Sequence, residues 1–318
     1  MIFIKKVFHL FAFICVYLRK NNITARKAGN TLVVFSLFCL TSVHAANDRA
    51  FFWQVTSPGN GASAYLLGSI HYADKSFYPL RDEIENAFKQ SDALVVELNI
   101  EAVDENAYNR ILAEKGLYKD GKTIRDTVSR ETWLQLQQRL KLMNLSYDTV
   151  KHYKPGILVL TLTSVQVMQM GFDPALGIDM HFLSQAVQKK KSILELETLE
   201  QQLDLFLDIP DADLLLKETL YSMDESEQMM ADMIIYWKAG NEKQMNKLLF
   251  DDAISDYPEF AKIYEQLFYR RNRQMANKID AMLKKGGTYF VVVGAGHLLG
   301  ARGVVRLLEA RGFEVVRR

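Results

Sequence analysis

The sequence predicts an α/β protein with a mixed, largely parallel central sheet, flanked by helices and carrying a large helical insertion. Short apolar runs of strand length, bounded by turn residues, alternate with longer segments in which apolar residues recur every three or four positions. A stretch from about 210 to 285 shows the helical spacing throughout. Strands that alternate with helices favour parallel pairing, and the long helical stretch before the last two strands indicates an insertion.

Six segments are expected to form the sheet, because each has strand length and ends at turn residues. They are 51–55, 64–68, 93–98, 192–196, 289–294 and 313–317. Helical spacing predicts five further helices between these strands. They are expected at 80–90, 130–143, 155–170, 174–186 and 301–312.

The first 45 residues differ in composition from the rest of the chain, since they contain no Asp or Glu and six Lys or Arg. The apolar run "TLVVFSLFCLTSVHA" follows two basic residues and ends in small ones, as in a secretory signal peptide cut before Ala46. An earlier apolar run, broken by Lys5 and Lys6, is too short for a membrane span and is compatible with an extended start.

These features predict that residues 1–45 are a leader or signal peptide and that residues 46–318 form a single domain. The protein is therefore expected to be periplasmic or secreted. A leader that is not cleaved would instead anchor it in the inner membrane, which is the one membrane contact that the sequence indicates.

Removal of the leader changes the charge and the cysteine content. The chain has 39 Lys or Arg and 38 Asp or Glu, and the loss of six positive residues changes its formal charge from +1 to −5. This balance argues against nucleic acid as a partner. Both cysteines, Cys15 and Cys39, also lie in the leader. The exported chain would thus have no disulfide, thiol nucleophile or cysteine zinc site.

Two histidines follow strands in the same pattern. Gly68 and His71 lie in "GSIH", and Gly294 and His297 lie in "GAGH", 226 positions further on. Loops that leave the carboxyl ends of parallel strands gather at one edge of a sheet, so the two histidines are expected to face one crevice. The glycines are expected to supply backbone angles that other residues avoid. Either histidine alone is equally compatible with a hydrogen-bonded turn residue.

Two histidines with one or two carboxylates would form a hydrolytic metal site. Glu97 ends an apolar strand, where a lone buried carboxylate is costly unless it is paired or bound to a metal. Glu197 follows the strand at 192–196, with Glu195 as a competing candidate. Mn²⁺, Co²⁺ and Zn²⁺ all remain candidates for the ion.

A basic helix provides a second group of candidates. The segment "YRRNRQMANKID" places Arg270, Arg271 and Arg273 around Asn272, and an arginine here would suit a substrate carboxylate or carbonyl. In "PALGIDMHFLSQA", Asp179 is expected to cap a helix, and His181 is expected to be a surface or packing residue.

Other enzyme classes lack their motifs. "GAGHLLG" has the wrong glycine spacing and too little following chain for a dinucleotide-binding fingerprint. The sequence contains neither a Gly-x-Ser-x-Gly elbow nor a His-Glu-x-x-His motif.

With its two Gly-x-x-His motifs, "SDALVVELN", "SILELETLEQQ" and "RRNRQMANKI", the sequence resembles the TraB/GumN family, which includes the Tiki metalloproteases. The resemblance implies a metal-dependent, peptidase-like site. In it His71 and His297 are metal ligands, and Glu97 and Glu197 are ligands or the general base. Arg271 with Asn272 would orient the substrate or polarise its carbonyl.

The leading hypothesis is a metal-dependent hydrolase that cleaves peptide or amide bonds of a peptide or protein substrate. The alternative is a non-catalytic periplasmic protein that binds and sequesters a peptide or another ligand in the same crevice. A structural metal site without chemistry is a third reading of the same residues.

Overall fold

The computed structural model describes residues 48–209, 211–251 and 261–318. The expected leader, with its signal-peptide pattern and both cysteines, lies outside these residues. Within the described ranges, none of the helices combines the length and the apolar composition that crossing a membrane requires.

A six-stranded sheet forms the centre of the fold, with the strand order β4-β3-β5-β2-β1-β6. The strands β4, β3, β5 and β2 run parallel to one another, whereas β1 pairs antiparallel with both β2 and β6. The predicted mixed, largely parallel sheet is therefore confirmed. The strands are β1 (Phe52–Thr56), β2 (Ser63–Ser69), β3 (Ala93–Val96), β4 (Ser192–Glu195), β5 (Thr288–Gly294) and β6 (Glu314–Arg317).

The position of each strand follows its hydrophobic pattern. β5 lies in the middle of the sheet and reads as one apolar run, "TYFVVVG", because both of its faces are covered. The edge strands β4 and β6 each keep two exposed residues. All six strands expected from the sequence are present, with ends that differ from the expected ones by at most two residues.

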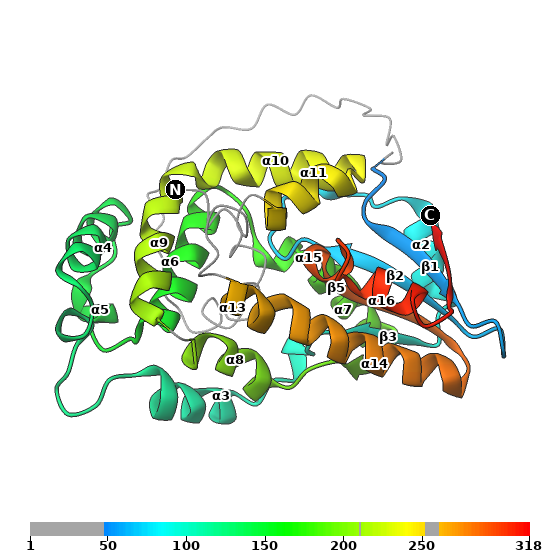
Figure 1. Cartoon of the computed structure of the whole chain (residues 1–318), viewed down its shortest axis with the longest axis horizontal. Coiled ribbons are helices and arrows are strands. Elements are labelled where there is room, and N and C mark those ends of the chain that lie inside the picture. The colour runs from blue at the N-terminus through cyan, green and yellow to red at the C-terminus, as the bar shows by residue number, and fades with distance from the viewer. Residues whose placement is uncertain (1–47, 210, 252–260) are drawn as a thin grey trace, which may run out of the picture.

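Helices fill the connections on both sides of β4. The predicted helical insertion is present after β4, and a second group of helices lies between β3 and β4. In Figure 1, α4, α5, α6 and α9 gather at the end of the molecule away from the strands. The principal helices are α2 (Asp82–Gln90), α3 (Glu105–Ile111), α4 (Arg130–Leu142), α5 (Tyr147–Val150), α6 (Pro155–Gln169), α7 (Ile178–Gln188), α8 (Leu199–Leu207), α9 (Ala212–Ser222), α10 (Ser226–Ala239), α11 (Glu242–Asn246), α13 (Ala261–Tyr264), α14 (Arg270–Lys285), α15 (Ala295–Leu298) and α16 (Val304–Glu309).

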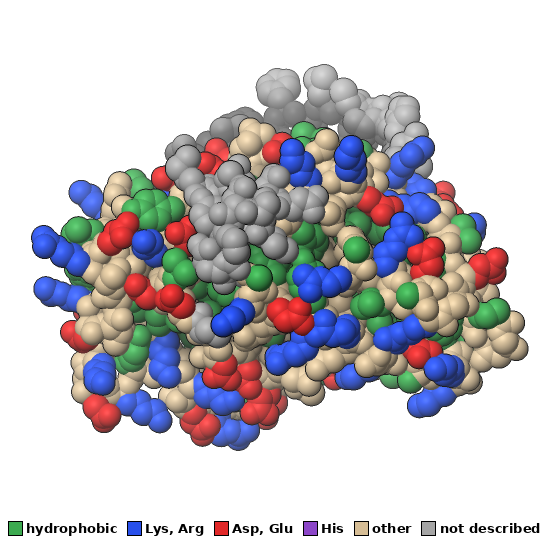
Figure 2. All heavy atoms as spheres, in the orientation of Figure 1, with side chains coloured by type: hydrophobic (Ala, Val, Ile, Leu, Met, Phe, Trp, Pro, Cys, Tyr) green, Lys and Arg blue, Asp and Glu red, His purple; other side chains and the backbone are tan. Residues whose placement is uncertain are grey.

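Helices cover both faces of the sheet. On one face, Phe88 of α2 and Phe182 of α7 pack against Phe290 of β5, with ring centroids 5.5 and 4.7 Å from it. On the other face, α14 and α16 lie in front of the strands in Figure 1. Figure 2 shows positive and negative side chains intermingled over this front face. The sheet is thus a buried layer, and its carboxyl edge is the place where loops from several strands meet.

The strand register aligns the two Gly-x-x-His motifs. Ser69 of β2 pairs with Gly294 of β5, so the chain leaves both strands at the same level. The carbonyl of Gly68 accepts a hydrogen bond of 2.7 Å from Nε1 of Trp237, whose side chain is fully buried. This bond fixes the end of β2 to α10 and therefore fixes the start of the loop that carries His71.

Gly156 allows α6 to contact α8 closely. A Cβ atom at Gly156 would lie 1.9 Å from the carbonyl oxygen of Phe206, so we expect Gly156→Ala to lower the free energy of unfolding by about 1–3 kcal/mol. The gain in helix propensity, at most about 1 kcal/mol, has the opposite sign and is smaller. Urea unfolding monitored by circular dichroism measures the change.

Gly59→Ala is the matched control, since a Cβ atom there has no neighbour within 4 Å. Its unfolding midpoint should equal or slightly exceed that of the wild type. Equal midpoints for Gly156→Ala and Gly59→Ala would contradict the packing assigned to α6 and α8.

Candidate functional site

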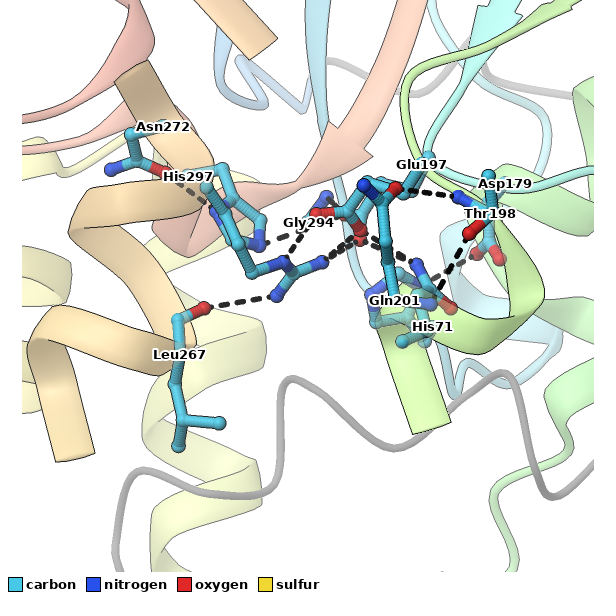
Figure 3. A network of polar contacts seen from close by, with 12 residues as sticks. His71, Asp179, Glu197, Thr198, Gln201, Leu267, Asn272, Gly294 and His297 are labelled. Carbon is cyan, nitrogen blue, oxygen red and sulfur yellow. Dashed lines mark hydrogen bonds and ion pairs between the residues drawn. The ribbon is translucent and has the colours of Figure 1, made fainter. Parts of the chain in front are cut away.

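The side chains of His71, Glu97 and His297 converge at Gly294, the end of β5. His71 lies two residues beyond β2, Glu97 follows β3 directly, and Gly294 is the last residue of β5, which lies between those strands. A Cβ atom on Gly294 would be 3.2 Å from Nε2 of His71, 3.4 Å from Oε1 of Glu97 and 3.6 Å from Cδ2 of His297. The structure therefore brings together the two histidines, 226 positions apart in sequence, on either side of Gly294 (Figure 3). Glu97 lies beside the same glycine.

The glycines of the two motifs act through their small size. Gly294 has φ −50°, and neither it nor Gly68 has a positive φ. The expectation of unusual backbone angles is therefore wrong. A Cβ atom on Gly68 would lie 3.0 Å from the Cα atom of Ala295 and from Cβ of Phe51. Each glycine leaves room for a close neighbour that a larger residue would displace.

Glu97 connects the histidines to the basic helix. Its Oε1 accepts a hydrogen bond of 2.7 Å from the backbone N–H of Gly294 and lies 3.9 Å from Nε2 of His297. Its Oε2 accepts a bond of 2.6 Å from Nη2 of Arg271 and a longer one, 3.4 Å, from Nε2 of Gln202. The carboxylate is 11% exposed and is oriented by all of these partners.

Arg271 and Glu197 form a buried bidentate pair. Nε and Nη2 of Arg271 donate to the two carboxylate oxygens of Glu197 over 2.6 and 2.7 Å, and Nη1 donates to the carbonyl of Leu267. The side chains are 4% and 5% exposed. Burial disfavours the charged guanidinium, but the carboxylates of Glu197 and Glu97 outweigh it and raise the pKa of Arg271. One cation thus balances two buried anions.

Asp179 holds the ring of His71. Its Oδ1 lies 3.2 Å from Nδ1 of His71 and accepts a bond of 2.8 Å from Oγ of Ser69. Burial lowers the pKa of His71, but the carboxylates of Asp179 and, to a smaller extent, Glu97 outweigh it, so the pKa lies above its ordinary value. Gly177 allows this contact, because a Cβ atom there would be 2.3 Å from the carbonyl oxygen of His71.

Asn272 holds the ring of His297. Nδ2 of Asn272 donates to the carbonyl of Arg302 over 2.9 Å, which turns its Oδ1 toward Nδ1 of His297 at 2.6 Å. An amide oxygen only accepts, so Nδ1 of His297 carries the proton of this bond. Nδ1 of His297 is therefore hydrogen-bonded, whereas Nδ1 of His71 lies beside the Asp179 carboxylate without a hydrogen bond to any described residue. Nε2 of His297 lies near Glu97, and Nε2 of His71 lies near Gly294.

The histidines and carboxylates of the cluster are residue types that bind metal ions, but they are not arranged as a metal site. An oxygen acceptor on the second ring nitrogen is the usual surrounding of a histidine ligand. In the described part of the chain, however, no three His, Cys, Asp or Glu side chains are arranged to hold a metal ion. Arg271 accounts for this difference, because it occupies both oxygens of Glu197 and one oxygen of Glu97.

The other sequence candidates lie away from the cluster. Glu195 is exposed and accepts a hydrogen bond of 2.7 Å from the backbone N–H of Asn99. His181 packs on Tyr78 and contacts Glu85 over 2.7 Å, which agrees with a packing role. Nδ1 of His152 lies 3.0 Å from the carbonyl of Lys122.

Two residues of the cluster, Asp179 and Gln202, were not predicted from the sequence. Asp179 was expected to cap a helix, yet the N-terminus of α7 has no side-chain cap and Asp179 contacts His71 instead. Nε2 of Gln202 donates to both Glu97 and Glu197. An acidic residue in a first helical turn is a common stabilising feature, so no local signal marks Asp179 as a partner of His71.

A cavity of about 350 Å³ lies on the Arg271 side of the cluster, between α8 and α14. Glu197 and Arg271 belong to its lining, whereas the two histidines do not. The ion pair therefore separates the cavity from the histidine pair.

The fold and the cluster define a class of α/β protein in which buried histidines and carboxylates meet at the carboxyl edge of parallel strands. A sequence model of the TraB/PrgY/gumN family matches residues 51–317. The chain belongs to the TraB/PrgY/gumN family, which confirms the resemblance seen in its motifs.

Two relatives illustrate the range of the family. The uncharacterized protein YbaP of Escherichia coli (strain K12) is 28% identical over 257 residues, which cover 80% of this chain and 91% of that protein. The metalloprotease TIKI2 of Danio rerio is 22% identical over 345 aligned positions, which cover 87% of this chain and 62% of that protein. No solved structure matches the chain.

Removal of Arg271 should destabilise the fold. Arg271→Met leaves two buried carboxylates without their cation, and we expect a loss of about 3–5 kcal/mol in the free energy of unfolding. The measurement is urea unfolding in the presence of a chelator, so that no bound cation replaces the guanidinium.

Arg273→Met is the control, since Arg273 is half exposed and its change should stay within about 0.5 kcal/mol. Adding Glu97→Gln and Glu197→Gln to Arg271→Met should recover part of the lost stability, because the unbalanced charges are removed. A wild-type midpoint for Arg271→Met alone would show that the buried pair does not stabilise the fold.

Proposed function

We propose that this protein is a metal-dependent hydrolase that cleaves peptide or amide bonds at the carboxyl edge of its parallel strands. The observation that carries the proposal is the convergence of His71, His297 and Glu97 on the α-carbon of Gly294. The distant relationship to TIKI metalloproteases supports the same chemistry.

In this proposal His71 and His297 hold a divalent ion together with Oε1 of Glu97, and Mn²⁺, Co²⁺ and Zn²⁺ remain the candidates. When bound, the ion would polarise the substrate carbonyl and lower the pKa of water. Glu197 acts as a further ligand only if Arg271 gives up its hydrogen bonds, which are 2.6 and 2.7 Å long.

The remaining residues orient the site and move the proton. Asn272 holds Nδ1 of His297 by a hydrogen bond and the Asp179 carboxylate faces Nδ1 of His71, so Nε2 of each ring is the atom presented for binding. Glu97 and Glu197 are both candidates for the proton acceptor. Arg271 would orient the substrate carbonyl from the cavity side, whereas Asn272, with both ends of its amide bonded, acts by positioning His297.

The protein is further proposed to act after export, as a single domain of residues 46–318. The predicted signal peptide supports this location, and a leader retained in the inner membrane is the alternative. A peptide or a protein is the proposed substrate.

A second candidate function is ligand binding without turnover. It is favoured by the cavity, which is lined by Arg271 and Glu197 and not by the histidines, so that a ligand can be held there without contact to them. This candidate predicts binding that survives removal of both histidines.

Hydrolysis of a peptide library with added Mn²⁺, Co²⁺ or Zn²⁺ tests the leading proposal. We expect the double variant His71→Ala/His297→Ala to lose on the order of 100-fold in rate, and a chelator to have the same effect on the wild type. His152→Ala is the control, since His152 lies outside the cluster. Equal cleavage by the wild type and the double variant would refute the proposal.

Asp179 should set the protonation of His71. Because the Asp179 carboxylate raises the pKa of His71, Asp179→Asn should lower it. An NMR titration of the histidine ring protons in metal-free protein measures the shift, and Asp232→Asn on the exposed side of α10 is the control. An unchanged pKa of His71 in Asp179→Asn would contradict the assigned contact.

A further inference from the structure

The cavity between α8 and α14 has walls of mixed chemistry around the Arg271–Glu197 pair. Its volume of about 350 Å³ is at the lower end of the range for small-ligand sites, about 300–1,000 Å³. Besides that pair, the lining consists of Gln201, Asp204, Leu205, Asp208, Gln266, Arg270 and Gln274.

Most charges in this lining are already balanced within the protein. Both oxygens of Glu197 accept bonds from Arg271, and Oδ1 of Asp204 lies 2.7 Å from Nζ of Lys115. Among the described residues, neither Asp208 nor Arg270 has an ion-pair partner within 4.0 Å, and both are exposed. Lys115, which pairs with Asp204, acts on Asp208 only at longer range. One carboxylate therefore remains on the α8 wall and one guanidinium remains on the α14 wall.

The glutamines add neutral donors and acceptors between these charges. Gln201 uses its Oε1 to accept from the backbone N–H of Thr198 over 3.0 Å, and Gln266 donates from Nε2 to the carbonyl of Leu205 over 3.4 Å. The opposite end of each amide, the Nε2 of Gln201 and the Oε1 of Gln266, remains to bond a ligand. Gln274 contributes a third amide to the lining.

We propose that this cavity binds short peptides through their free termini, with the α-carboxylate at Arg270 and the α-ammonium group at Asp208. A guanidinium suits a carboxylate because it offers two parallel donors, and an aspartate accepts from an ammonium group in a charge-assisted bond. The glutamine amides complement the peptide group between the two termini. This inference rests on the proposed function for its link to peptide chemistry, and it narrows the ligand class proposed for this cavity to short peptides with charged ends.

Three probes test the inference by isothermal titration calorimetry on the metal-free full chain. Dialanine keeps both terminal charges. N-acetyl-dialanine keeps only the carboxylate, and dialanine amide keeps only the ammonium group. We expect dialanine to bind about ten-fold more tightly than either blocked form, since a hydrogen bond to a charged group contributes at least this factor.

The variants assign each terminus to its wall. Arg270→Gln should bind dialanine and dialanine amide equally, and should still bind dialanine more tightly than N-acetyl-dialanine. Asp208→Asn should bind dialanine and N-acetyl-dialanine equally, and should still bind dialanine more tightly than dialanine amide. Arg273→Gln is the matched control, because Arg273 lies on the same helix, is not part of the cavity lining and pairs with Glu265. Circular dichroism checks that these exposed substitutions leave the fold intact. Equal binding of the three probes, no binding of dialanine, or wild-type discrimination in Arg270→Gln would overturn the inference.

The test separates this inference from the proposed hydrolase function. Calorimetry without metal measures binding alone. Tighter binding of dialanine than of the blocked probes, together with an uncleaved peptide library, supports peptide binding in the cavity and refutes the hydrolase. Cleavage of library peptides with blocked ends, together with equal binding of the three probes, supports the hydrolase and refutes the cavity assignment.

Discussion

The site depends on one buried guanidinium. Arg271 reaches from α14 to Glu97 after β3 and to Glu197 after β4, and it joins the two neighbouring strand ends to the helix that covers them. Two buried carboxylates this close would repel each other without a cation. The same pairing orients Glu97 toward the histidines and closes the inner side of the cavity.

The strand order explains why these residues meet. β5 lies between β2 and β3, so the loops that carry His71, Glu97 and His297 leave three adjacent strands at one edge. Gly294 lies at the centre, where a Cβ atom would be within 3.6 Å of all three side chains. A Cβ atom here would press on Nε2 of His71 at 3.2 Å, which gives the glycine of this Gly-x-x-His motif a steric basis.

Family membership and site geometry limit the function to different degrees. The relatives of this chain include the distant metalloprotease TIKI2 and the uncharacterized protein YbaP. Functional sites vary on a shared fold, so hydrolysis is proposed from the histidine pair and peptide recognition from the cavity. These two features are separated by the Arg271–Glu197 pair, and a ligand that displaces Arg271 from Glu97 would connect them.

Local patterns in the sequence were sufficient for the six strands, the helical connections, the family and the pairing of His71 with His297, because hydrophobic periodicity and turn residues are encoded over short distances. Contacts that depend on distant segments were not predictable. Asp179 reaches His71 across 108 positions, and Gln202 reaches Glu97 across 105. A first-turn acid and a helical glutamine look the same in sequence whether they face solvent or a buried cluster. Only the packing of α7 and α8 against the strand ends decided which of them joins the site.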